Sequence, residues 1–353
     1  MFELIKQLTE LSGPVGQEEI VLDTVAELWE PYCQRLERTR LGNILGSVGG
    51  QGPRILLVAH ADELCYLVRA IDENGFIWLA SGQDWDGPKL SWRESFAIGQ
   101  RVRVLARSGT IRGVIASATG HLAMLMLKEP DELTWNDIWV DTGLTAEELK
   151  ARGVTPGTRV IWDAATEQFG SHIVGKALDN RGSVAILTEL LRQLSVDELQ
   201  CDLSVTCTIQ EEIYLVGIRE IAEKGDYDAA IVLEVGLCSD IPGISSPAIS
   251  VKMGGGPILV HKDSMIHYDT RISNHLEKLS QDSNLPIQHA VFGCFGTEGS
   301  PLMRAGIPTS LLAFPTRYTH TPYETADIHD MEALLEWVKA FLYSDLSWLA
   351  CES

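Results

Sequence analysis

Apolar runs that end in polar residues are the dominant pattern along this chain. Residues 54–60 form a continuous run of this kind, which is typical of a parallel strand buried on both faces. In residues 203–209, apolar positions alternate with Ser and Thr, as in a strand that leads to a polar phrase. Residues 229–233 and 308–314 predict two further strands, and the helical spacing of apolar positions in 184–194 predicts a helix among them.

Helical patterns begin and end the chain. Residues 2–11 and about 16–30 predict helices that are separated by a break at Ser12-Gly13-Pro14. The spacing of leucine and valine over about 330–345 predicts a final helix. Helices that alternate with buried strands indicate an α/β fold with a central mixed, mostly parallel sheet.

The pattern of apolar and polar residues differs between about residue 70 and residue 162 from that of the rest of the chain. Glycines separate short β-type segments there, and no helical spacing is evident, which favours a small barrel or sandwich. We therefore predict a discontinuous α/β domain, residues 1–69 and 163–353, interrupted by a β-rich insert at 70–162.

Composition and charge narrow the classes of partner. The 353 residues carry a formal net charge of −21, which disfavours binding to nucleic acid or to an anionic membrane. No run approaches the roughly 18 apolar residues of a membrane span, and the N-terminus lacks the features of a signal peptide. Seven scattered cysteines without a CxxC pair fit a reducing cytoplasm best.

Histidines and carboxylates follow several of the predicted strands. Because open α/β sheets bind ligands at the carboxyl ends of their strands, these side chains are expected to converge. Imidazole and carboxylate ligands suit zinc, cobalt or manganese, and five residues can hold two divalent ions if one carboxylate bridges. The five candidate metal ligands, with Asp179 as the bridge, are His60, Asp179, Glu212, Glu234 and His320.

Two further carboxylates have predicted catalytic roles. Asp62 can accept the second imidazole N–H of His60 and fix its tautomer. Glu211 is then a spare base that can take a proton from water and return it to a leaving amine. Each of these phrases alone is common on a solvated surface, so the prediction depends on their combination at several strand ends.

At these residues the chain resembles the dinuclear metallo-aminopeptidases that include glutamyl aminopeptidase and the tetrahedral aminopeptidase (TET). The resemblance runs nearly end to end. It is carried by phrases at 12–18, 60–63, 176–181, 210–212, 254–257 and 315–324, namely Ser12-Gly13-Pro14 with Glu18, His60-Ala61-Asp62-Glu63, Lys176-Ala177-Leu178-Asp179-Asn180-Arg181, Gln210-Glu211-Glu212, Gly254-Gly255-Gly256-Pro257, and Pro315-Thr316-Arg317-Tyr318-Thr319-His320-Thr321-Pro322-Tyr323-Glu324.

The resemblance implies a metal-dependent aminopeptidase that removes N-terminal residues from short peptides. It implies His60 and Glu234 on one ion, Glu212 and His320 on the other, and Asp179 between them. It also implies a β-barrel-like dimerisation domain within a homo-oligomer, either a dimer or a tetrahedral dodecamer.

The chain departs from the family pattern at four places. Glu234 stands where aspartate is common, Asn180 replaces a second aspartate, and Glu298 replaces the aspartate of a Gly-Thr-Asp phrase. Residues 213–215 replace a small residue and a glycine. These departures bear on substrate and metal preference more than on the type of reaction.

Two alternative functions stay open. A related dizinc carboxypeptidase or N-deacylase uses similar ligands, but there the extra domain would follow the Glu-Glu phrase rather than precede Asp179. A weakly active or non-catalytic assembling homologue is motivated by Glu234 and Asn180. Glycoside hydrolysis is disfavoured, because it needs two carboxyls facing each other about 5–10 Å apart, whereas Glu211 and Glu212 are adjacent.

Overall fold

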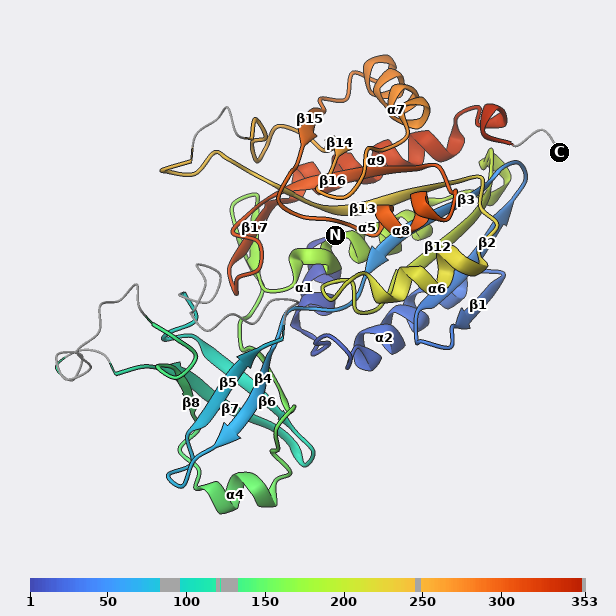
Figure 1. The fold of residues 1–353 in the computed structure, drawn as a ribbon. Helices are drawn as coiled ribbons and strands as arrows, with labels where there is room; N and C mark the ends of the chain where they lie inside the picture. Colours follow the sequence, from blue (N-terminus) through green and yellow to red (C-terminus); the bar gives the residue numbers. More distant parts are fainter. Residues whose placement is uncertain (83–95, 119–120, 122–132, 245–248, 351–353) are drawn as a thin grey trace. The chain divides into compact units, whose positions relative to one another are not determined.

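The computed structural model describes residues 1–82, 96–118, 121, 133–244 and 249–350. The chain divides into two compact units (Figure 1). The first unit contains residues 1–63, 166–319 and 323–353, and the second contains residues 64–165 and 320–322. Cys351 lies outside the described residues, and the six cysteines within them are free.

The first unit is built on an eleven-stranded mixed sheet. At its centre, four strands lie in the order β12-β3-β13-β16, and each pairs with its neighbour in parallel. These strands are β12 (Asp202–Thr208), β3 (Arg54–His60), β13 (Ala229–Leu237) and β16 (Thr309–Arg317). The flanking strands are β1 (Arg35–Arg38), β2 (Ile44–Gly50), β17 (Glu324–Asp327), β11 (His172–Gly175), β10 (Glu167–Phe169), β14 (Ile258–Lys262) and β15 (Gln288–Val291).

Helices cover both faces of this sheet, and two separate apolar clusters lie beneath them. One face carries α1 (Phe2–Glu10), α2 (Glu19–Trp29), α5 (Leu178–Gln193), α7 (Thr270–Asp282) and α9 (Ile328–Tyr343). The other face carries α6 (Val216–Lys224) and α8 (Gly299–Arg304). Short 3₁₀ segments are η1 (Glu30–Tyr32), η4 (Val196–Glu198) and η5 (Ser347–Leu349). Because both faces are covered, the central strands are apolar along most of their length.

The second unit contains a closed six-stranded barrel in which every pairing is antiparallel. Its strands, in barrel order, are β4 (Tyr66–Ile71), β5 (Ile77–Ser81), β8 (Trp139–Asp141), β7 (Gly109–Ala116), β6 (Arg101–Ala106) and β9 (Arg159–Trp162). Its apolar interior includes Tyr66, Val102 and Val160. The predicted α/β fold with a mixed central sheet and an inserted barrel is therefore confirmed.

Two local expectations need correction. The β-rich insert also contains the short helix α4 (Ala146–Ala151), which begins with a capping box in which Thr145 and Glu148 bond each other's backbone N–H groups. Strand β13 does not end before Glu234 but continues to Leu237, because Val235 also packs into the core. Among the described residues, no helix is long and apolar enough to cross a membrane.

Candidate metal centre

The centre of the candidate site is the imidazole of His60, the last residue of β3. His60 is fully buried, and neither ring nitrogen makes a hydrogen bond of standard geometry with any residue that the structure describes. Nδ1 lies 3.3 Å from Oδ1 of Asp62, and Nε2 lies 3.3 Å from Oδ1 of Asp179. A buried polar group in this state is costly unless another partner binds it.

Three more carboxylates, those of Glu211, Glu212 and Glu234, come close to the same ring. Nε2 of His60 lies 3.7 Å from Oε2 of Glu234 and 3.8 Å from Oε2 of Glu211. Ligand atoms of His60, Glu211 and Glu234 lie within 4.8 Å of one another, and so do those of His60, Asp179 and Glu212. Buried carboxylates this close repel one another unless a cation or protons neutralise them. The donor set therefore fits divalent metal ions.

Glu211 and Glu212 lie on a short segment that we name the Glu-Glu loop, residues 209–217, which runs from the end of β12 into the start of α6. Asp62 accepts hydrogen bonds from the backbone N–H groups of Glu211 and Glu212, at 3.0 and 3.1 Å. Backbone hydrogen bonds also join the two ends of the loop, including Gly217 N to Ile209 O at 3.0 Å. These contacts explain how two adjacent glutamates at a strand end can serve one site.

Asp179 enters from the start of α5. Its backbone N–H donates to Oε2 of Glu324 at 3.0 Å, and the peptide bond between Asp179 and Asn180 is cis. The side-chain amide of Asn180 donates to the carbonyl of Leu233 at 2.8 Å, directly before Glu234. An aspartate carboxylate at position 180 has no proton to donate in this way. Asn180 thus links the segment of Asp179 to the strand of Glu234.

The buried groups of this site shift one another's pKa. Burial, together with the negative charges of Glu234 and Glu212, raises the pKa of Glu211 well above its ordinary value. Burial and the charge of Asp179 do the same to the pKa of Glu234. Burial opposes protonation of His60, but the carboxylates of Glu211, Asp179 and Asp62 together outweigh it and raise the pKa of His60 well above its ordinary value. When no metal is bound, these shifts favour protonation of His60, Glu211 and Glu234.

The structure brings together six of the seven predicted site residues, namely His60, Asp62, Asp179, Glu211, Glu212 and Glu234. His320 belongs with Thr321 and Pro322 to the second compact unit, and its backbone is left-handed with φ of 65°. Its role as a ligand stays a prediction, as do the roles of the other six.

Sequence reasoning missed a buried ion triad behind the site. Glu63 accepts from Nζ of Lys176 at 2.6 Å and from a guanidinium nitrogen of Arg181 at 3.1 Å, and all three residues are buried. Arg181 also donates to backbone carbonyls, including those of Ala61 and Gly13. The triad joins the segments that carry His60 and Asp179. The available signal was that both cations flank Asp179 in its phrase.

Two buried glutamates near the site were also not assigned roles from the sequence. Glu18 accepts from the backbone N–H of Gln210 at 3.2 Å, and burial with the charge of Asp62 raises its pKa to about 7. Glu298 is fully buried, and burial raises its pKa to about 7 against the opposing charge of His60. Both groups belong to the electrostatic surroundings of the centre.

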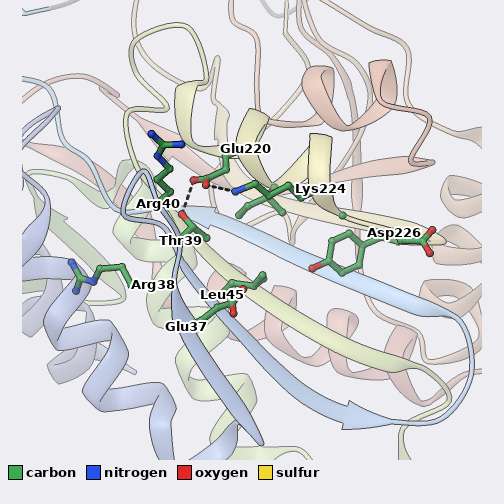
Figure 2. A pocket seen from close by; sticks show the side chains of 11 residues that line it. Glu37, Arg38, Thr39, Arg40, Leu45, Glu220, Lys224 and Asp226 are labelled. Carbon is green, nitrogen blue, oxygen red and sulfur yellow. Dashed lines mark hydrogen bonds and ion pairs between the residues drawn. The ribbon is translucent and has the colours of Figure 1, made fainter.

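A surface pocket of about 480 Å³ lies between the β1–β2 hairpin and α6 (Figure 2). Glu220 accepts there from Oγ1 of Thr39 at 2.7 Å and forms an ion pair with Lys224. Nearby, Asn43 donates to the carbonyl of Gly217 and accepts from the N–H of Ile209, at 3.0 and 3.1 Å. Asn43 therefore supports both ends of the Glu-Glu loop.

Comparisons with known proteins agree with this geometry. A family model described as M42 glutamyl aminopeptidase matches residues 42–336. The FrvX protein of Escherichia coli strain K12 is 31% identical over 345 residues, which cover 96% of this chain and 94% of FrvX. The match thus includes both compact units.

Solved structures show the same fold. A TET aminopeptidase from Thaumarchaeota archaeon SCGC AB-539-E09 superposes with a TM-score of 0.89 at 28% identity, covering 98% of this chain and 97% of the other. PhTET1, which forms a dodecamer, superposes with a TM-score of 0.83 at 24% identity, covering 97% of this chain and 98% of the other. The chain therefore belongs to the M42 glutamyl aminopeptidase family and is a peptidase.

Proposed function

We propose that this protein is a metal-dependent aminopeptidase that removes N-terminal residues from short peptides. The observation that carries the proposal is the buried His60, whose Nε2 has three carboxylates within 3.8 Å in a chain of the M42 family. Stability of the core does not account for a cluster of this composition, because apolar residues of similar volume often stabilise a core at least as well as buried charged groups do.

Two divalent ions are proposed for this cluster, with zinc or cobalt favoured over manganese. His60 and Glu234 would hold one ion, Glu212 and His320 the other, and Asp179 would bridge them. The support is that His60 belongs to both three-residue groups suited to a metal. When bound, such ions polarise the peptide carbonyl and lower the pKa of water.

Glu211 is proposed as the general base. Its carboxylate would accept a proton from the attacking water and return it to the leaving amine, which keeps the reaction balanced in protons. The buried position supports this role, because burial raises the pKa of Glu211 toward the range that suits proton transfer. Asp62 is a positioning residue that holds His60 and the backbone of Glu211.

The remaining parts of the proposal concern substrate size, assembly and location. Short or unfolded peptides are the proposed substrates, and a homo-oligomer, either a dimer or a tetrahedral dodecamer, is the proposed state. The likeness to PhTET1, whose structure is a dodecamer, supports the assembly. A cytoplasmic location is proposed on the six free cysteines, since a reducing compartment keeps thiols in this state.

The deciding experiment compares unblocked and N-acetylated peptides after the metal-free protein is supplied with zinc, cobalt or manganese. Release of the first residue from unblocked peptides alone is expected. Cleavage of acetylated peptides or acylated amino acids instead would favour the N-deacylase reading, and release from the other end would favour a carboxypeptidase. No turnover with any metal, together with less than one bound ion per chain, would favour a non-catalytic homologue. The Glu211→Gln variant controls for contaminating peptidases.

A further inference from the structure

Tyr214 has a backbone conformation that tyrosine disfavours. Its φ is 59°, and the φ of the following Leu215 is 58°, so two successive non-glycine residues are left-handed. Such a conformation places Cβ close to the next carbonyl oxygen, which costs free energy for every residue except glycine. Strain of this kind persists where the surrounding structure imposes it, and it gathers at functional sites.

The Glu-Glu loop imposes this conformation. Leu215 N donates to Glu211 O and Val216 N donates to Gln210 O, both at 3.1 Å, so the chain turns back tightly after Glu212. The Leu215 side chain is buried in the apolar core beneath α6, which explains its own strained backbone. Tyr214 lies within this turn, between the residues that these two backbone hydrogen bonds join.

Packing does not explain why position 214 carries an aromatic ring. The Tyr214 side chain is 61% exposed, the largest exposed fraction among the exposed large hydrophobic residues of the described chain. A glycine would adopt the same backbone without strain. The tyrosine therefore strains the backbone, and most of its surface is exposed rather than packed against the described residues.

Tyr214 lies close in the chain to the proposed site residues Glu211 and Glu212. Residues 212 and 214 are two positions apart, so their Cα atoms are separated by at most about 7 Å. A peptide whose first carbonyl lies at Glu211 and Glu212 would therefore have side chains within reach of the ring. A rigidly held aromatic ring binds apolar side chains well, because little conformational freedom is lost on contact.

We infer that Tyr214 is a specificity-determining residue that packs against an apolar or aromatic peptide side chain next to the scissile bond. This inference rests on the proposed function. The acidic cluster would recognise the charged amine and the carbonyl, whereas Tyr214 would select the side chain. Peptides with Leu or Phe beside the scissile bond would then be preferred over peptides with Gly.

The test compares Tyr214→Gly and Tyr214→Phe with the wild type on two peptide series, one varied at the first residue and one at the second, with Gly, Ser, Leu or Phe. For Leu and Phe peptides in at least one series, Tyr214→Gly should raise KM about tenfold, the size of one lost aromatic contact. KM for Gly peptides and kcat should change less than threefold. Tyr214→Phe should keep the wild-type selectivity.

Two controls separate substrate contact from structure. The melting temperature of Tyr214→Gly should equal or exceed that of the wild type, because the backbone strain is relieved. Tyr32→Ala, a matched change at another exposed tyrosine, should leave selectivity unchanged. Unchanged selectivity in Tyr214→Gly, an equal effect on all peptides, or a changed particle size with unchanged selectivity would overturn the inference. Absence of wild-type turnover with every metal would remove the proposed function as well.

Discussion

The side chain of Asp62 bonds the backbone N–H of Glu211. Oδ1 of Asp62 lies 3.0 Å from the backbone N of Glu211, and the same oxygen lies 3.3 Å from Nδ1 of His60. One carboxylate therefore fixes both the orientation of the buried imidazole and the start of the Glu-Glu loop. The proposed metal ligand and the proposed base depend on this one residue for their spacing.

Replacing Asp62 with Asn tests this arrangement. The amide keeps one oxygen acceptor but loses the other, so a backbone N–H of Glu211 or Glu212 is left unpaired at a cost of about 1–3 kcal/mol. Metal affinity and kcat/KM should each fall about 10- to 100-fold, as is usual for partners of metal-bound histidines. Chelator competition and peptide kinetics measure both. Asp345→Asn, at an exposed turn, is the control, and wild-type values for Asp62→Asn would contradict the assignment.

Glu211→Gln separates the base from the ligands. The change removes the proton acceptor but keeps the shape of the side chain, so metal content and melting temperature should stay close to those of the wild type. Turnover should fall about 10²- to 10⁴-fold. Metal analysis of one preparation checks the unchanged metal content, and peptide hydrolysis by the same preparation checks the loss of turnover. If the variant keeps full activity, another group must accept the proton.

His60→Ala and Asp179→Ala should lose metal as well as activity. His60 contributes to both metal-suited groups, and Asp179 is the nearest carboxylate to its Nε2. Elemental analysis after dialysis should show at least one ion fewer per chain in each variant. His329→Ala is a suitable control, because His329 is exposed at the start of α9. An unchanged metal content in His60→Ala would exclude the site.

The sequence predicted the parts of this site that follow strand ends. His60 is the last residue of β3, and the Glu-Glu pair lies just beyond the end of β12, where an apolar run stops at a polar phrase. Glu234 does not lie at a strand end, because β13 continues beyond it to Leu237. A single carboxylate inside an apolar strand is visible in the sequence, but the end of the strand is not.

Contacts between distant segments could not be read from the sequence. Lys176 lies 113 positions from Glu63, and nothing in the local pattern distinguishes a buried cation from a surface one. Asn43 supports the Glu-Glu loop from 166 positions away, within a turn that has no catalytic motif. Pairing of this kind is fixed by the folded topology, so it becomes evident only when β2, β3 and β12 are placed side by side.

Glu63→Gln should destabilise the first unit strongly. Removal of the charge leaves Lys176 and Arg181 buried without their partner, which costs about 3–5 kcal/mol. The pKa of Glu63 is lowered, because Lys176 and Arg181 outweigh the effect of burial. The stabilisation is therefore fully present above the ordinary carboxyl pKa of 4.5 and is lost as the pH falls through the lower, folded value.

Denaturant unfolding of the wild type and Glu63→Gln at several pH values measures this effect. The difference in unfolding free energy should be largest at neutral pH and should shrink below about pH 4.5. Glu37→Gln breaks an ion pair that is exposed on β1 and should change stability little. A difference of similar size for the two variants would mean that the buried triad contributes no more than a surface pair.

Glu298→Gln should reveal a carboxyl that the folded protein prefers to keep protonated. Burial raises the pKa of Glu298 from 4.5 to about 7, so the native state binds more protons than the unfolded state between these values. Wild-type stability should therefore decrease as the pH rises through this window, by at most about 3 kcal/mol. The glutamine stays neutral, so the variant lacks this loss.

The measurement is the melting temperature of chelator-treated wild type and Glu298→Gln between pH 5 and pH 8. The variant should become progressively more stable than the wild type as the pH rises, and Glu147→Gln, at an exposed position of α4, should show no such trend. A constant difference would mean that Glu298 is already ionised at pH 5. Added zinc should reduce the trend, because a bound cation near His60 favours the ionised carboxylate and lowers the pKa of Glu298.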